Sequence, residues 1–230
     1  MKYKNIRQGI FLSRPNRFIA YVELDGEVVK CHVKNTGRRK ELLIEGVIVF
    51  LEEHDNPNRK TKYSLIGVKK GDILINMDSQ APNKVVEEWL KEGGLYANPS
   101  LVKREKTYGN SRFDFYVEAG EKRCFIEVKG VTLEEEQIAK FPDAPTERGI
   151  KHIKELCDCR KDGYEAYIIF VIQLKGIVKF EPNIQTQPEF QQALVKAKRA
   201  GVHILAYDCL VTQDELWIDQ KIDVDLKENM

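Results

Sequence analysis

The sequence predicts an α/β protein (α+β overall), in which a small N-terminal β-barrel precedes a mixed sheet flanked by helices. Three observations carry this prediction. Short strand-like runs separated by turn residues fill the first 80 residues, strand-like and helix-like runs alternate after Ala81-Pro82, and 230 residues suffice for two modest domains. We therefore expect domains at 1–80 and 81–230.

The first domain is predicted from closely spaced strands. The runs are GIFLSR, RFIAYVEL, GEVVKCHV, EGVIVFLEE, KYSLIGV and DILINMD, with turn signals such as RPN, LDGE, NTG, DNPN and KKGD between them. Five or six such strands favour a small barrel or sandwich. Because the segment is also basic, we expect an OB-like barrel, a fold that binds single-stranded nucleic acid through basic and aromatic side chains.

The second domain is predicted from alternating elements. APNKVVEEWLKEGG predicts a helix with Pro82 in its first turn, and LVKREKTYG, RFDFYVE and RCFIEVKGVTL predict successive strands. APTERGIKHIKELCDCRKDG and PEFQQALVKAKRAG are amphipathic and predict helices, whereas YEAYIIFVIQL and VHILAYDCLV are continuous apolar runs typical of buried strands. This order predicts a mixed sheet covered by helices.

Composition narrows the functional class. No apolar run reaches the roughly 18–20 residues that span a bilayer, and the first residues, MKYKNIRQGIFLSRPNRF, lack the features of a signal peptide. Five cysteines form no disulfide framework, and Cys157-Asp158-Cys159 has no second Cys/His pair at zinc-ligand spacing. We therefore expect a cytoplasmic protein without a membrane association, with structural or incidental thiols.

Charge is distributed unevenly. Residues 1–80 carry 15 Lys and Arg against 10 Asp and Glu, whereas residues 81–230 carry 22 against 26. The first 22 residues contain Arg14 and Arg17 but no acid. A basic N-terminal part suits a polyanion, and an acidic remainder suits a divalent cation, although solubility alone would also account for the asymmetry.

The segment SRFDFYVEAGEKRCFIEVKG places charged residues in two neighbouring strands. Strand alternation puts Glu127 and Lys129 on one face, and a hairpin turn at EAGEK would bring Asp114 beside them, with Phe113 facing away. Two carboxylates can hold Mg²⁺ at a phosphate, and a lysine can stabilise charge there. The alternative is a Glu–Lys pair on an exposed face.

A third acid would strengthen the metal-site interpretation. Glu88 adjoins the apolar face of the first predicted helix and would lean toward the sheet, whereas Glu87 is expected to face solvent. Both glutamates could equally be surface charge.

The chain resembles the sugar fermentation stimulation protein (SfsA) family from end to end. The matching stretches are HVKNTGR, SRFDF, FIEVKGVTL and FPDAPTERGIKHIKEL. Asp114 followed by Glu127-Val128-Lys129 is also similar to the core of the PD-(D/E)xK nuclease superfamily, with Ser111-Arg112-Phe113 where a proline would precede the aspartate. Arg39 stands where many relatives are expected to have cysteine.

The resemblance implies an N-terminal OB-fold domain, a C-terminal nuclease-like domain and DNA binding. It implies that Asp114 and Glu127 are ligands of Mg²⁺ (or Mn²⁺), that Lys129 lies at the reaction centre and that Glu88 completes the catalytic set. The implied nucleic-acid-binding residues are Arg14, Arg17, Asn35, Arg38, Arg112, Thr146, Arg148 and His152. The residue pattern alone instead favours a capped helix start with solvated charges for FPDAPTERG, and NTGR by itself is only a turn.

Two functions follow from these expectations. The first is a Mg²⁺-dependent nuclease that hydrolyses DNA phosphodiester bonds. The second is a non-catalytic DNA-binding regulator of sugar (maltose) metabolism genes that retains a nuclease-like fold. We favour the enzyme because Asp114, Glu127 and Lys129 are all present. With no helix-turn-helix evident, we expect little sequence specificity. No paired-carboxylate glycosidase motif or phosphate-cradling glycine loop supports a sugar-converting role.

Overall fold

The computed structural model describes residues 1–35, 37 and 41–228. Its chain forms two compact units, whose members are Met1–Ala81, Gln173–Lys175 and Cys209–Trp217 in the first, and Pro82–Ile172, Gly176–Asp208 and Ile218–Met230 in the second. Residues 173–175 and 209–217 therefore join the N-terminal unit, although a division at residue 80 assigns them to the second domain.

Backbone hydrogen bonds explain why these late segments join the first unit. The N–H of Tyr3 donates to the carbonyl of Asp214 at 2.7 Å, and the N–H of Leu216 donates to the carbonyl of Met1 at 3.0 Å. The buried amide of Gln173 donates to the side chain of Asn76 at 2.9 Å. Contacts this distant in sequence cannot be read from local patterns.

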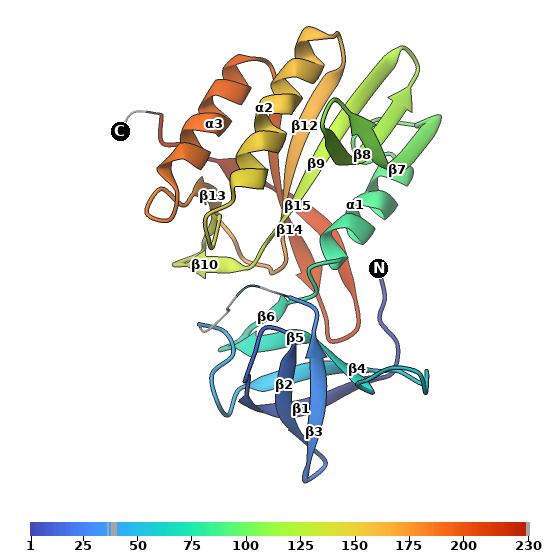
Figure 1. Cartoon of the computed structure of the whole chain (residues 1–230), viewed down its shortest axis with the longest axis vertical. Coiled ribbons are helices and arrows are strands. Elements are labelled where there is room, and N and C mark those ends of the chain that lie inside the picture. The colour runs from blue at the N-terminus through green and yellow to red at the C-terminus, as the bar shows by residue number, and fades with distance from the viewer. Residues whose placement is uncertain (36, 38–40, 229–230) are drawn as a thin grey trace. The chain divides into compact units, whose positions relative to one another are not determined.

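The described part of the first unit contains one six-stranded sheet in the order β3-β2-β1-β4-β5-β6, and a parallel pairing of β3 with β5 closes five of its strands into a barrel (Figure 1). The predicted OB-like barrel is therefore confirmed. Its strands are β1 (Ile6–Ser13), β2 (Ile19–Leu24), β3 (Glu27–Val33), β4 (Ile48–Glu53), β5 (Tyr63–Lys70) and β6 (Ile73–Asn76).

The barrel follows from strand alternation. In β2, Ala20 and Val22 are buried while Tyr21 and Glu23 are exposed, so one face fills the interior and the other meets solvent. Gly9 allows β1 to approach β2 closely, because a Cβ atom there would lie 2.6 Å from a methyl carbon of Val22.

The described part of the second unit is built on a nine-stranded sheet in the order β10-β11-β13-β15-β14-β12-β9-β8-β7. β9 runs parallel to β12, β12 parallel to β14, and β9 antiparallel to β8. The strands are β7 (Leu101–Tyr108), β8 (Ser111–Ala119), β9 (Lys122–Val131), β10 (Leu133–Glu135), β11 (Ile138–Phe141), β12 (Glu165–Ile172), β13 (Lys179–Pro182), β14 (His203–Val211) and β15 (Leu216–Val224).

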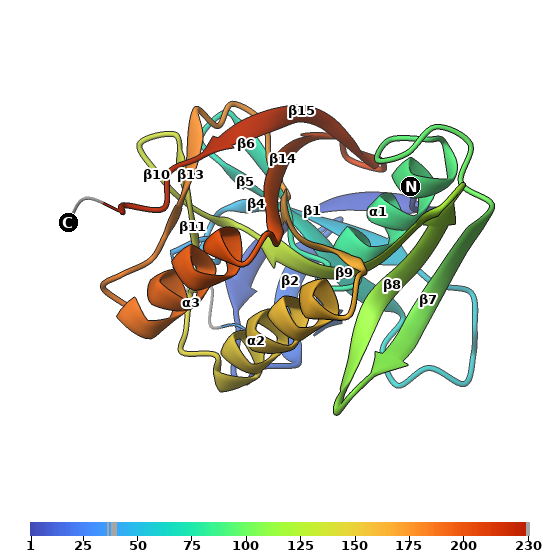
Figure 2. The same ribbon diagram turned by 90° about the horizontal axis from the view of Figure 1, so that it is seen from above.

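Helices cover both faces of this sheet, as Figures 1 and 2 show. Helices α2 (Glu147–Lys161) and α3 (Pro188–Arg199) lie side by side on one face, whereas α1 (Ala81–Lys91) covers the other face, where Trp89 packs against Tyr207 with ring centroids 5.0 Å apart. The mixed sheet flanked by helices is confirmed. Among the described residues, no helix is long and apolar enough to cross a membrane.

Candidate functional site

The β8–β9 hairpin forms as the sequence predicts. Antiparallel pairs run from Phe115 opposite Ile126 to Ala119 opposite Lys122, and Gly120, at a φ of 59°, lies in the tight turn between them. A positive φ at this position favours glycine, which has no Cβ atom. The pairs end at Phe115 opposite Ile126, one position before Asp114 and Glu127, so the hairpin brings the strands of these two residues together.

At Asp114 the side-chain carboxylate, rather than a backbone carbonyl of β8, accepts the hydrogen bond from β9. Asp114 Oδ2 accepts a hydrogen bond from the backbone N–H of Val128 at 2.8 Å, and Oδ1 accepts one from the Asn83 amide of α1 at 2.8 Å. Asn83 is a site residue that sequence reasoning missed, because an amide in the first turn of a helix gives no signal of its own.

The predicted alternation of β8 is wrong at Phe113. Its ring lies 5.6 Å from that of Phe125, and the ring of Tyr116 lies 5.0 Å from the same residue, so Phe113 and Tyr116 reach one aromatic cluster. Strict alternation would put them on opposite faces. The irregularity coincides with Asp114 and with Glu105 on β7, whose φ of 55° interrupts the β7–β8 pairing at this position without shifting its register.

Glu127 is the most buried charged group of the site, with 3% of its surface exposed. Its Oε1 atom accepts from Lys129 Nζ at 2.6 Å and lies 2.6 Å from Nδ1 of His152 on α2. The other oxygen, Oε2, is buried and receives no hydrogen bond from any described residue. A buried carboxylate oxygen without a donor is costly unless a cation or water satisfies it.

The two carboxylates have pKa values shifted in opposite directions. Burial, followed by the negative charge of Glu127, raises the pKa of Asp114, although the N–H of Val128 and the Asn83 amide offset part of this. Burial alone would also raise the pKa of Glu127, but the hydrogen bond with His152 and the charge of Lys129 lower it below the usual value. A cation near both groups would relieve the repulsion that Asp114 experiences.

The residues present fit a hard divalent cation. Glu127 Oε2 is an orphaned buried oxygen, and Asp114 supplies a second carboxylate whose charge is unfavourable without a counter-ion. Mg²⁺ is commonly held by one or two carboxylates, with water and phosphate completing its octahedron. The described residues contain no group of three or more His, Cys, Asp or Glu side chains that could hold a metal, so the protein would supply only part of the ligand sphere.

The expected third acid is not where the sequence placed it. Glu88 is exposed, and it lies about 140° around α1 from Asn83, five residues away at 100° per residue. Glu87 is the more buried of the two and pairs with Arg104 of β7 at 3.4 Å. The expectation that Glu87 faces solvent and Glu88 leans toward the sheet is therefore wrong. Val85, Val86 and Leu90 are buried as expected, but the two glutamates lie at opposite margins of this apolar face, where the apolar pattern does not decide which is more buried.

His152, which the family resemblance implies to bind nucleic acid, is buried, with 5% of its surface exposed. Its ring makes an edge contact with Phe113 at 5.9 Å, and its Nδ1 atom faces Glu127. Arg148, one turn earlier, is exposed and donates from Nε to His152 Nε2 at 3.4 Å. The structure brings Asp114, Glu127, Lys129 and His152 into one cluster, with Arg148 at its rim.

Thr146 has a structural position at the start of α2. Its hydroxyl accepts the N–H of Gly149 at 3.0 Å, which makes it the N-cap, and its own N–H donates to Gln187 at 2.8 Å. The capped-helix interpretation therefore accounts for this residue.

Thr146→Ala is expected to lower the free energy of unfolding by about 1 kcal/mol, because the cap hydrogen bond is lost. Thr146→Ser, which keeps the hydroxyl, should retain most of the stability in the same denaturant titration. A fall in DNA affinity for Thr146→Ala without any loss of stability would contradict the capping role.

Arg112 and the barrel residues Arg14 and Asn35 have their own hydrogen-bond and ion-pair partners. Arg112 is exposed and pairs with Glu105 at 3.4 Å. Arg14 donates to the carbonyls of Gly37 and Asn35 at 2.8 and 2.6 Å, and Asn35 is buried, with its amide donating to the carbonyl of Met77 at 3.1 Å.

Arg14 and Asn35 thus hold a loop together, whereas Arg17 is exposed in the loop between β1 and β2. Arg38, expected to contact nucleic acid, and Arg39 lie outside the described residues.

The chain combines an OB-like barrel with a mixed α/β sheet, and this sheet carries clustered carboxylates and a lysine. These two parts define a two-domain class of protein. Family models match both parts: the SfsA N-terminal OB domain over residues 12–77, and the Sugar fermentation stimulation protein RE domain over residues 80–215. The chain belongs to the sugar fermentation stimulation protein (SfsA) family.

Close relatives extend over the whole chain. A sugar fermentation stimulation protein homolog of Clostridium beijerinckii is 62% identical over 97% of this chain and 99% of its own length. A homolog from Ruminiclostridium cellulolyticum is 61% identical over 98% of this chain and 100% of its own length. A solved structure of Pyrococcus furiosus SfsA in complex with Ca²⁺ matches with a TM-score of 0.89 at 30% identity, over 98% of each chain.

Proposed function

We propose that this protein is a Mg²⁺-dependent nuclease that hydrolyses DNA phosphodiester bonds, with Mn²⁺ as an alternative cation. One observation carries the proposal: Glu127 Oε2 is buried with no donor among the residues that the structure describes, at the place where the hairpin brings Asp114 to the same cluster. This arrangement disfavours an empty, negatively charged site and favours a divalent cation.

The residues have distinct tasks in this proposal. Asp114 and Glu127 would hold the cation, and Asn83 and the Val128 N–H orient the Asp114 carboxylate. Lys129, held 2.6 Å from Glu127 Oε1, presents a positive charge that can stabilise a developing negative charge on phosphate. When bound, the cation supplies charge neutralisation at phosphate and acidification of water.

The solved relative supports a divalent cation. Pyrococcus furiosus SfsA was obtained in complex with Ca²⁺. Ca²⁺ and Mg²⁺ both prefer oxygen ligands, and they differ in size and in the regularity of the coordination that they require. An oxygen-rich site of this kind in the present chain is consistent with either ion.

Cleavage is tested by incubating single-stranded, duplex and structured DNA with the protein and either Mg²⁺ or Mn²⁺. Product strands should appear with cation and disappear when a chelator is added. Intact DNA of all three kinds with both cations would rule out the nuclease.

The alternative is a DNA-binding regulator without catalysis. It is favoured by the absence, within the described residues, of a set of three metal-binding side chains, since Glu88 is exposed. DNA binding without cleavage in the preceding assay would support this alternative.

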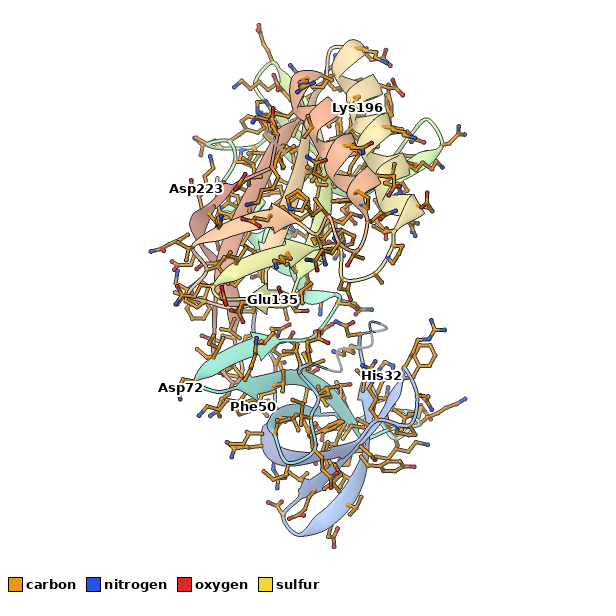
Figure 3. All side chains as sticks on the ribbon, turned by 90° about the vertical axis from the view of Figure 1, so that its left-hand side faces the viewer. His32, Phe50, Asp72, Glu135, Lys196 and Asp223 are labelled. Carbon is orange, nitrogen blue, oxygen red and sulfur yellow. The ribbon has the colours of Figure 1, made fainter. Side chains whose placement is uncertain are left out.

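We infer that the outer face of the barrel contributes to DNA binding. Phe18 and Tyr21 are 54% and 37% exposed, and Lys30 is the cross-strand partner of Tyr21. His32, labelled in Figure 3, is the cross-strand partner of Ser64, whose hydroxyl accepts from Arg59 at 2.9 Å. Burial, followed by the charges of Arg59 and Lys34, lowers the pKa of His32. Exposed rings among cations suit unpaired bases and their phosphates.

Replacing both Phe18 and Tyr21 by alanine is expected to weaken binding of single-stranded DNA by at least about 10-fold, because base stacking contributes roughly 1–3 kcal/mol per base. Fluorescence anisotropy over a series of salt concentrations would measure this. Val28→Ala removes another exposed apolar side chain, 64% exposed on β3, and should leave affinity unchanged. Equal affinity for DNA in all three proteins, or an affinity that does not depend on salt concentration, would contradict a DNA-binding role for the outer face of the barrel.

A further inference from the structure

Helix α2 delivers two nitrogen-bearing side chains to the carboxylate site. Arg148 and His152 are one turn apart and therefore share a helix face, and the Thr146 cap fixes where that helix begins. His152 is buried against Phe113, whereas Arg148 is exposed. The helix thus links an exposed guanidinium to Glu127 through a buried imidazole.

The hydrogen bonds of His152 specify its tautomer. A guanidinium has only donors, so Nε2 of His152, which lies 3.4 Å from Arg148 Nε, must accept with its lone pair. The ring proton then resides on Nδ1, which lies 2.6 Å from Glu127 Oε1 and donates to it.

These contacts make the two oxygens of Glu127 unequal. Lys129 and His152 both donate to Oε1, whereas Oε2 has no donor among the described residues. The terminal torsion of a glutamate side chain is broad and roughly two-fold, so it does not distinguish the oxygens by itself. Two donors on the same oxygen impose the difference and leave the second oxygen directed elsewhere.

We propose that Arg148 and His152 are positioning residues. Arg148, as a donor to Nε2, and the Glu127 carboxylate, as an acceptor from Nδ1, together fix the Nδ1–H tautomer of His152, and His152 holds Glu127 so that Oε2 is presented to a divalent cation. The inference rests on the proposed function for the cation, but the tautomer and the orientation are properties of the protein alone.

The tautomer is measured directly by long-range ¹H–¹⁵N correlation of the imidazole in the ¹⁵N-labelled, full-length protein without added cation. The wild-type spectrum should show His152 with its proton on Nδ1. Arg148→Met should change the chemical shift of Nε2, because the donor to that nitrogen is gone, while the Glu127 carboxylate keeps the proton on Nδ1. A wild-type ring protonated on Nε2 alone would overturn the proposal.

Two matched variants test the effect on the cation. His152→Asn places an amide nitrogen near the position of Nδ1 and can still donate to Glu127, whereas His152→Gln places its nitrogen near Nε2. Calorimetric titration with Ca²⁺ or Mn²⁺ should give near wild-type affinity for His152→Asn and a roughly 10–100-fold loss for His152→Gln. Thermal unfolding of both apoproteins controls for folding.

The outcomes separate the two proposals. Cation binding by the wild-type protein, with the same affinity in both variants or the same loss in both, would overturn the positioning role and leave the proposed function standing. Absence of cation binding by the wild-type protein would overturn the cation role of this pair together with the proposed function, whatever the imidazole spectrum shows.

Discussion

Glu127→Gln is expected to reduce DNA cleavage by at least roughly 1,000-fold while DNA affinity stays within a few-fold of wild type. Glutamine keeps the shape of the side chain and can still accept at Oε1, but it replaces the orphaned Oε2 with an amide that cannot bind a cation. Lys129→Met should lower the rate by about 100–1,000-fold, because one charge that stabilises the transition state is lost. Single-turnover cleavage and anisotropy would measure rate and affinity separately.

A second glutamate–lysine pair in the same unit provides the matched control. Glu135 of β10, labelled in Figure 3, is 62% exposed on its side chain and pairs with Lys140 of β11. Glu135→Gln and Lys140→Met should cleave DNA as the wild type does. Cleavage that survives Glu127→Gln would remove this residue from the catalytic site.

A divalent cation is expected to raise the midpoint of thermal unfolding, and Asp114→Asn should abolish the rise. Binding to the folded state alone at 100 times the Kd stabilises a protein by about 2.7 kcal/mol. For 150–250 residues this corresponds to a shift of roughly 5–10 °C. The cation removes the repulsion from Glu127 that, together with burial, raises the pKa of Asp114. Differential scanning calorimetry with Mg²⁺, Mn²⁺ and Ca²⁺ would measure the shift.

Asp223→Asn is the control for this experiment. Asp223 is an exposed aspartate of β15 in the same unit, labelled in Figure 3, and its replacement should leave the cation-induced shift intact. An equal shift in Asp114→Asn and wild type would show that the cation binds somewhere else.

Local patterns were sufficient for the fold and for the central hairpin. Three local features carried these predictions: the alternation in β2 and β9, the EAGEK turn and the apolar run of β12. Each depends only on residues that are close in sequence, for which strand alternation and turn preferences are reliable guides. They place Glu127 and Lys129 together and put Asp114 on the neighbouring strand, as the structure has them. The nuclease reaction and its cation remain proposals.

The burial of side chains at the margins of the helical faces could not be predicted from the same patterns. The relative burial of Glu87 and Glu88 was reversed, and nothing in the helical pattern indicated that His152 is buried beside Glu127. An amphipathic pattern defines a broad apolar stripe on a helix. Whether a residue at the margin of this stripe is buried or exposed depends on how the helix packs against the sheet, which the pattern does not specify.

By itself, the sequence determined the barrel, the mixed sheet and the pairing of the strands that carry Asp114 and Glu127. Only the tertiary structure decided which oxygen of Glu127 is satisfied, that Asn83 supports Asp114, and that residues 173–175 and 209–217 join the barrel unit. The reason is physical: strand alternation and turns depend on neighbouring residues, whereas hydrogen bonds across 25 or more positions in sequence depend on the packing of the complete chain.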